Sequence, residues 1–150
     1  YKIPRALYIG DTRVAHGGFY PDSQLRLIQT GSGFFNDRKV HEAIKIDGPV
    51  STLKNEMRHY AYKTVKEFEE AMDKYARLSA EEFAQRKNQN WRTSPLNAAL
   101  HPAWTFFYRY FCRGGFLDGK LGLELATIYS DYVRKKIRYL EEKKTQLPEG

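Results

Sequence analysis

The stretch MRHYAYKTVKEFEEAMDKYARL, residues 57–78, contains the point at which the pattern of apolar residues in this chain changes. Beyond that point, apolar side chains recur at steps of three and four positions, at Val65, Phe68, Met72 and Tyr75. This period is typical of an amphipathic helix. Thr64 and Glu67 also have the spacing of a capping box, which marks a helix start. The sequence therefore predicts a helix from Thr64 and a boundary near Lys63.

Upstream of that boundary the chain has the features of short strands joined by turns. Apolar and polar residues roughly alternate in residues 5–9 and 24–28, as expected of half-buried strands. Glycine, aspartate and proline interrupt this pattern at residues 10–11, 17–18, 31–33 and 47–49. Residues 1–63 are therefore predicted to form a part rich in strands and loops.

Further helices are predicted downstream. Ser79 with Glu82 repeats the capping spacing, which predicts that the first helix ends near residue 78 and a second runs toward residue 88. Pro102 suits the first turn of the next helix. The aromatic side chains of residues 103–113 fall on more than one face of that helix, so we expect it to be buried on several sides.

The segment GGFLDG, residues 114–119, is expected to end the aromatic helix because glycine favours helix termination. The last helix then carries a single apolar stripe, at Leu121, Leu125, Ile128, Tyr132 and Tyr139. The predicted fold class is therefore α+β. Residues 1–63 would form the β-rich part, and residues 64–150 a helical C-terminal region.

Composition narrows the class of protein. The 150 residues are 41% hydrophobic and 15% aromatic, which favours a folded domain over a disordered chain. The formal net charge of +7 favours polyanionic partners such as nucleic acid, an anionic membrane surface or phosphorylated small molecules. The sequence has a single cysteine and lacks the run of roughly 20 apolar residues that spans a bilayer. We therefore expect a cytoplasmic protein with only peripheral membrane contact.

Asp22 ends the segment HGGFYPD, residues 16–22, which combines two glycines with a proline. Glycine lets the backbone approach a ligand closely and proline stiffens a turn, so the carboxylate would be held at the rim of a site. Such a carboxylate is able to act as a general base on an acceptor hydroxyl. The alternative is that Asp22 caps a turn or a helix start, and the local pattern by itself favours that alternative.

Other polar residues are candidate ligands. His41 and Glu42 follow a predicted strand, where the imidazole can bind a divalent metal or a phosphate, although a surface pair is the alternative. Arg26 suits a diphosphate or a carboxylate across the sheet equally well. His59 has no partner at a fixed spacing, which favours a structural role over a zinc site. The glycine-rich nucleotide loops and the common hydrolase motifs are absent from the sequence.

Phe116 and Leu117 form an apolar tip with cationic flanks, at Arg109, Arg113 and Lys120. The aromatic helix and the basic last helix allow three interpretations: core with a solvated face, a nucleic-acid surface, or a segment against an anionic membrane. Core is the preferred interpretation for most of these positions. For Phe116 and Leu117 the cationic flanks favour membrane contact.

Taken together, four segments resemble, in their order and spacing, bacterial family 2 glycosyltransferases of the lipopolysaccharide-core glucosyltransferase type. These segments are HGGFYPDSQLRLIQTGSGFF, VHEAI, IDGPVSTLKNEMRHYAY and RGGFLDGKLGLELA. The resemblance implies the C-terminal, acceptor-side part of an enzyme with a GT-A fold. Its nucleotide-binding half, with an aspartate-rich metal motif, would lie upstream of Tyr1, so this fragment by itself is expected to be inactive.

The resemblance also implies roles for individual residues. Asp22 matches the catalytic base of an inverting sugar transfer from a nucleotide-sugar donor to a lipopolysaccharide, a cell-envelope glycan or a related glycolipid. The implied substrate-binding residues are Phe19, Tyr20, Gln24, Arg26 and Glu42, and the implied metal ligand is His41. A divalent metal, Mg or Mn, would be bound mainly by the upstream half.

Phe19 departs from the family pattern, which commonly has tryptophan there, so we expect altered packing against the acceptor sugar. The expected location is the cytoplasm, with peripheral contact at the inner face of the cytoplasmic membrane. The competing hypothesis is a non-catalytic basic module that contacts an anionic membrane surface or nucleic acid. Nucleic acid is the less favoured of these partners.

Overall fold

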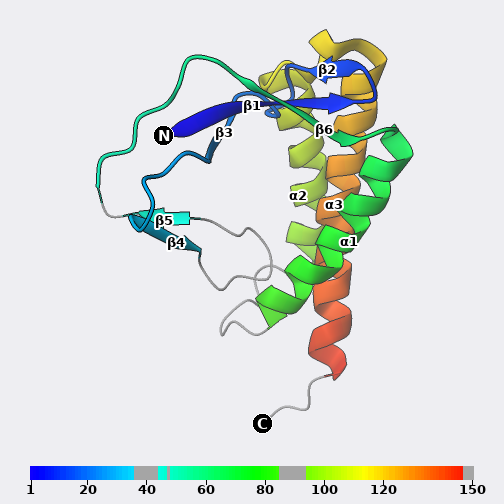
Figure 1. Cartoon of the computed structure of the whole chain (residues 1–150). Helices are drawn as coiled ribbons and strands as arrows, with labels where there is room; N and C mark the ends of the chain where they lie inside the picture. The colour runs from blue at the N-terminus through cyan, green and yellow to red at the C-terminus, as the bar shows by residue number, and fades with distance from the viewer. Residues whose placement is uncertain (36–43, 47, 85–93, 147–150) are drawn as a thin grey trace.

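The computed structural model describes residues 1–35, 44–46, 48–84 and 94–146 and has the predicted α+β class. A small sheet lies against one end of a group of helices (Figure 1). The strands are β1 (Lys2–Ile9), β2 (Thr12–Val14), β3 (Asp22–Leu25), β4 (Gly33–Phe35), β5 (Ile44–Ile46) and β6 (Met57–Tyr62). The helices are α1 (Val65–Ala84), α2 (Pro95–Phe107), the π-helix η2 (Tyr108–Cys112), the 3₁₀ helix η3 (Gly115–Asp118) and α3 (Gly119–Gln146).

Strand β1 is the centre of the main sheet. Its residues Arg5–Ile9 pair in parallel with β6, and its opposite edge is shared by two antiparallel strands. The first half of β1 pairs with β3, where Arg5 lies opposite Asp22, and the second half pairs with β2. Strands β4 and β5 form a separate antiparallel pair. The sheet is therefore mixed, and it brings Asp22 next to a central strand.

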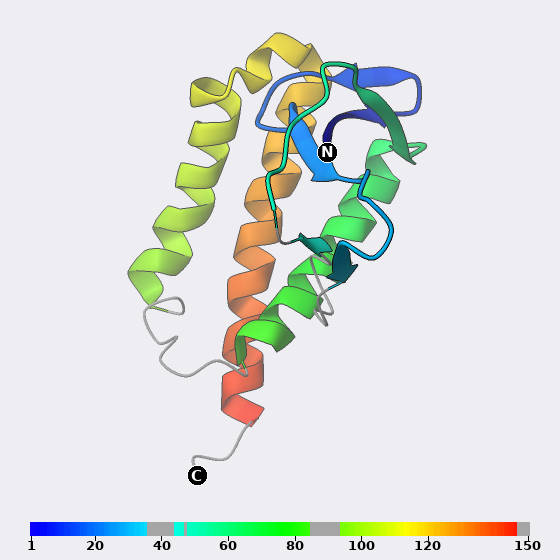
Figure 2. The ribbon, with the colours of Figure 1, turned by 60° about the vertical axis from the view of Figure 1, so that its left-hand side comes forward.

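Helix α3 lies between α1 and α2 (Figure 2). The core under the sheet combines Ile9 and Val14 with Phe68 of α1 and Leu125 of α3. A second cluster along the same two helices is formed by Ala76, Ala80, Tyr139 and Leu140. The apolar stripe predicted for the last helix is thus confirmed as the face of α3 that packs on α1.

The predicted helix start at Thr64 is confirmed. The hydroxyl of Thr64 accepts a hydrogen bond from the backbone N–H of Glu67 at 3.2 Å, and the Glu67 carboxylate accepts one from the N–H of Lys63 at 2.8 Å. The second predicted start, at Ser79, is wrong because α1 continues to Ala84. Ser79 is buried and its hydroxyl lies 3.3 Å from the Tyr132 hydroxyl, so it packs against α3.

The aromatic helix differs from its prediction in two ways. Helix α2 begins at Pro95 after an N-cap at Ser94, and Pro102 is buried inside the helix. The aromatic side chains are also less buried than expected, since Trp104 is 59% exposed and Phe111 is 52% exposed. Only one side of α2 packs on α3, and the outer side is apolar without being covered by any described residue.

Glycines shape the turn between η2 and α3, as the sequence predicted. Gly114 and Gly119 have φ values of 68° and 62°, in the region that favours glycine. A Cβ atom on Gly122 would lie 1.8 Å from the carbonyl oxygen of Gly115, so only glycine allows this close approach of α3 to η3.

Candidate functional site

The loop that carries HGGFYPD is fixed to the GGFLDG turn by a carboxylate. Asp118 accepts hydrogen bonds from the backbone N–H of Ala15 at 3.1 Å and of His16 at 2.8 Å. Its other oxygen lies 2.7 Å from Nδ1 of the His16 ring. The Gly17 carbonyl accepts a further hydrogen bond from Arg109 at 2.6 Å. Two motifs that are far apart in the sequence therefore form one structural unit.

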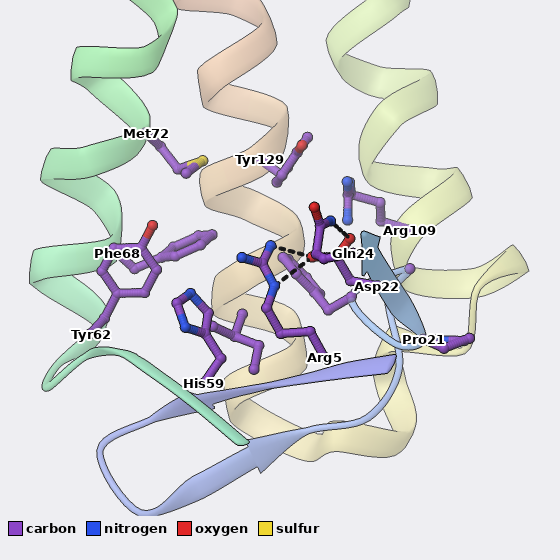
Figure 3. A pocket seen from close by; sticks show the side chains of 13 residues that line it. Arg5, Pro21, Asp22, Gln24, His59, Tyr62, Phe68, Met72, Arg109 and Tyr129 are labelled. Atoms are coloured by element: carbon purple, nitrogen blue, oxygen red, sulfur yellow. Dashed lines mark hydrogen bonds and ion pairs between the residues drawn. The ribbon is translucent and has the colours of Figure 1, made fainter. Parts of the chain in front are cut away.

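Asp22 is the first residue of β3 and faces the helices (Figure 3). Its Oδ2 atom accepts a hydrogen bond from Nε of Arg5 at 2.9 Å and a second one from the same guanidinium. Its Oδ1 atom accepts a hydrogen bond from the side-chain amide of Gln24. Gln24 lies on the same face because side chains two positions apart in a strand point the same way. The carboxylate is thus held in one orientation from both sides.

A pocket of about 400 Å³ lies between the sheet and the helices and includes Asp22 in its wall. The sheet contributes Arg5, Gln24 and His59, while α1 contributes Phe68 and Met72. Tyr62 of β6 adds an aromatic ring to the wall, as do Phe19 and Tyr129, and Arg109 adds a second guanidinium group. The pocket therefore combines a fixed carboxylate with aromatic surfaces and two guanidinium groups.

His59 lies in β6 opposite Leu7 of β1, and this pairing brings it into the pocket. Burial lowers the pKa of its imidazole, and the positive charge of Arg5 lowers that pKa further. The ring is therefore neutral near neutral pH and has a nitrogen able to accept a proton. Burial also raises the pKa of Tyr62, which keeps that hydroxyl protonated.

The predicted site residues do not all reach this pocket. Asp22, Gln24 and Phe19 line it. The Tyr20 ring contacts Arg13, whose guanidinium carbon is 4.8 Å from the ring centroid, and does not line the pocket. Arg26 is exposed and also lies outside the lining. His41 and Glu42 lie outside the residues that the structure describes.

Sequence reasoning missed Arg5 and Arg109 as site residues. Arg5 is brought to Asp22 by strand pairing, and Arg109 is brought to the Gly17 loop by the packing of η2. No spacing along the chain indicated either one.

Metal binding by these residues finds no support in their arrangement. Across residues 1–35, 44–46, 48–84 and 94–146, no three histidine, cysteine or acidic side chains are grouped so that they could hold an ion.

Among the helices that the structure describes, none is long and apolar enough to cross a membrane. Phe116 and Leu117 are 49% and 62% exposed, at the tip of η3.

No protein-family model and no solved structure matches this chain.

Proposed function

We propose that the chain is the acceptor-side, C-terminal part of an inverting family 2 glycosyltransferase. The observation that carries this proposal is the carboxylate of Asp22, held by Arg5 and Gln24 at the wall of a pocket with aromatic surfaces. The acceptor would be a lipopolysaccharide, a cell-envelope glycan or a related glycolipid. The resemblance of the HGGFYPD and GGFLDG segments to that family supports the same conclusion.

Asp22 would act as the general base. Each carboxylate oxygen has two lone-pair directions, and the contacts with Arg5 and Gln24 leave room for an acceptor hydroxyl to donate to the carboxylate. The hydroxyl would then lose its proton to Asp22 as its oxygen attacks the anomeric carbon of the donor. One carboxylate is sufficient because an inverting transfer forms no glycosyl-enzyme.

The aromatic wall of the pocket suits the acceptor sugar. The ring centroids of Phe19 and Tyr129 are 6.0 Å apart, and Phe68 lies at 6.1 Å from Phe19. Aromatic rings provide large apolar faces with little conformational freedom to lose on binding. The substitution of phenylalanine for the tryptophan of the family at Phe19 would reduce this surface and alter the acceptor preference.

The donor half of the reaction falls outside the described residues. A bound divalent metal, Mg or Mn, would neutralise the negative charge of the departing nucleotide diphosphate. Asp22 is already paired with Arg5, and among the described residues no three histidine, cysteine or acidic side chains are grouped so that they could hold an ion. Following the resemblance, the metal and the nucleotide-sugar would be bound mainly by the upstream half of the full-length enzyme, with His41 as the implied metal ligand in this chain. The proposed place of action is the inner face of the cytoplasmic membrane.

The test is sugar transfer by the full-length enzyme carrying Asp22→Asn, which keeps the shape of the side chain and removes its basicity. We expect the initial rate to fall by a factor of about 10² or more, in the range found for general bases. Asp11→Asn, at an exposed turn, makes the same chemical change and should keep the normal rate. A normal rate in both variants would show that Asp22 is not the base.

The second candidate is a basic module that contacts an anionic membrane surface. The observation that favours it is the exposed apolar side of α2 and η2, which includes Leu96, Leu100, Trp104, Phe107 and Phe111. It continues to the tip at Phe116 and Leu117, next to Arg113 and Lys120. Apolar surface flanked by cations suits a layer of anionic headgroups. This surface is compatible with either candidate function.

A further inference from the structure

A second cavity, of about 630 Å³, lies between α2 and α3 and shares Arg109 with the pocket that contains Asp22. Three cationic side chains line it: Arg109, Arg113 and Lys136. Trp104 and Tyr132 contribute aromatic surfaces to its walls. None of the described residues that line this groove is acidic. The groove therefore concentrates positive charge, and its described wall contains no carboxylate.

Arg109 shows the energetic consequence of this arrangement. It is partly buried, its guanidinium carbon is 3.4 Å from the Tyr129 ring centroid, and its hydrogen bond goes to a neutral carbonyl. Within the described part of the chain, no carboxylate pairs with it. Burial lowers the pKa of Arg109, and the positive charge of Arg113 opposes its ionisation further. An anion in the groove would offset both the burial cost and this repulsion.

Arg113 presents a second guanidinium to the same space. Its backbone N–H and C=O are used in the turn, by Tyr108 and Gly17. Its side chain is exposed and has no ion pair with any residue that the structure describes. Arginine binds phosphate oxygens with two parallel N–H groups, which makes it the usual residue for such groups.

We propose that the groove between α2 and α3 binds a phosphate group through Arg109, Arg113 and Lys136. Its assignment to a phosphate carried by the acceptor glycan or glycolipid rests on the proposed transferase function, whereas anion binding itself does not. The aromatic walls suit a sugar next to the phosphate. The proposal thus adds a phosphorylated acceptor to the proposed reaction.

The two cavities are neighbours, which supports a single ligand. Gly18, Arg109 and Tyr129 line both of them. A Cβ atom on Gly18 would lie 3.4 Å from Nε of Arg113 and 3.7 Å from Nη1 of Arg109. The absence of a side chain at Gly18 therefore lets the loop backbone lie close to both guanidinium groups. An acceptor could therefore place a hydroxyl at Asp22 and its phosphate in the groove.

Calorimetric titration of the 150-residue chain with glucose 6-phosphate and with glucose tests the site. We expect glucose 6-phosphate to bind at least about tenfold more tightly than glucose, because charge-assisted hydrogen bonds form only with the phosphate. Arg113→Gln with Lys136→Gln should remove about tenfold or more of that affinity. Lys66→Gln with Lys74→Gln, on the exposed surface of α1, removes the same number of positive charges and should have little effect. Circular dichroism would verify that each variant is folded.

A second titration distinguishes the source of the phosphate. Vesicles of phosphatidylglycerol, with phosphatidylcholine vesicles as the reference, offer the phosphate as a lipid headgroup. If the groove variants lose vesicle binding and glucose 6-phosphate does not bind, the site stands and its phosphate belongs to a lipid. If neither probe binds, or if Lys66→Gln with Lys74→Gln weakens binding as much as the groove variant does, the proposal is overturned. Neither result depends on sugar transfer, so the Asp22→Asn test remains separate.

Discussion

The Nδ1 atom of His16 lies 2.7 Å from the carboxylate of Asp118, although the two residues are 102 positions apart in the sequence. The same carboxylate accepts hydrogen bonds from the backbone N–H groups of Ala15 and His16. Its side chain is only 9% exposed, so water cannot readily replace these bonds. This contact fixes the loop that leads to Asp22 on the helical region.

Asp118→Ala should therefore destabilise the fold strongly, because it leaves two backbone donors without their acceptor. We expect a loss of about 2–4 kcal/mol in the free energy of unfolding, measured by urea denaturation. His16→Ala, which keeps both backbone bonds, should cost about 1 kcal/mol. Equal losses in the two variants would show that the backbone contacts of Asp118 contribute nothing.

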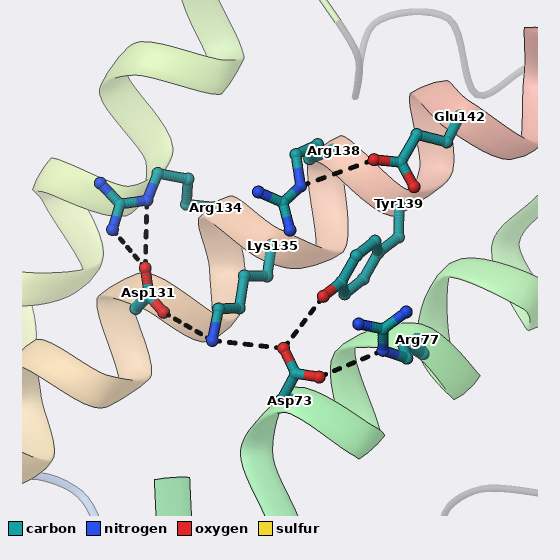
Figure 4. A network of polar contacts seen from close by, with 8 residues as sticks. All are labelled: Asp73, Arg77, Asp131, Arg134, Lys135, Arg138, Tyr139 and Glu142. Atoms are coloured by element: carbon teal, nitrogen blue, oxygen red, sulfur yellow. Dashed lines mark hydrogen bonds and ion pairs between the residues drawn. The ribbon is translucent and has the colours of Figure 1, made fainter. Parts of the chain in front are cut away.

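A network of charges joins α1 to α3 around Asp73 (Figure 4). Its carboxylate accepts hydrogen bonds from Arg77 at 3.1 Å and from the Tyr139 hydroxyl at 3.0 Å, and Lys135 lies at 3.2 Å. Burial by itself would raise the pKa of Asp73, but these hydrogen bonds outweigh it and lower that pKa. The unfolded chain therefore holds this proton more tightly than the folded chain does.

The stabilisation by Asp73 should be complete above the pKa of the unfolded side chain, about 4, and should be lost as the pH falls through the lower folded value. Asp73→Asn should cost roughly 1–2 kcal/mol at pH 7, and its difference from the native chain should shrink in acid. Urea denaturation at a series of pH values measures this difference. A constant difference from pH 7 to pH 3 would contradict the assignment, and Asp11→Asn is the matched control.

The electrostatic coupling between Arg5 and His59 can be measured directly. Arg5→Gln removes a positive charge near the imidazole. It also leaves the negative charge of Asp22 without its ion-pair partner, so that Asp22 acts more strongly on the imidazole. Both effects should raise the pKa of His59. Arg5→Lys keeps the charge and should shift that pKa less. An NMR titration of the His59 ring resonances reports the change. An unaltered titration in Arg5→Gln would show that the two side chains are not coupled in the pocket.

The fold was predictable where local patterns agree with packing. Thr64 and Glu67 form the expected cap, and glycines 114 and 119 end and begin helices as expected. The same capping pattern failed at Ser79, because burial against Tyr132 overrides a local preference. The prediction of a helix start at Pro102 was wrong because the helix begins earlier, at Pro95, after the N-cap residue Ser94.

The candidate site was predictable only in part, for a different reason. Asp22, Gln24 and Phe19 share one short segment, so a single motif indicated all three. Arg5, His59 and Arg109 reach the same pocket through strand pairing and helix packing. Contacts of that kind depend on the tertiary fold and leave no fixed spacing in the sequence.

Membrane contact at the tip of η3 gives the last prediction. Phe116 and Leu117 are about half exposed, and full burial of such side chains contributes roughly 1.5–3 kcal/mol each. Phe116→Ser with Leu117→Ser should therefore lower the affinity for phosphatidylglycerol vesicles by about tenfold or more, measured by sedimentation of the protein with the vesicles. Leu27→Ser removes a leucine that is 51% exposed in the strand-rich part and should leave binding unchanged. Because these substitutions leave all cations in place, a loss of binding would require apolar insertion at the tip, and undiminished binding would exclude it.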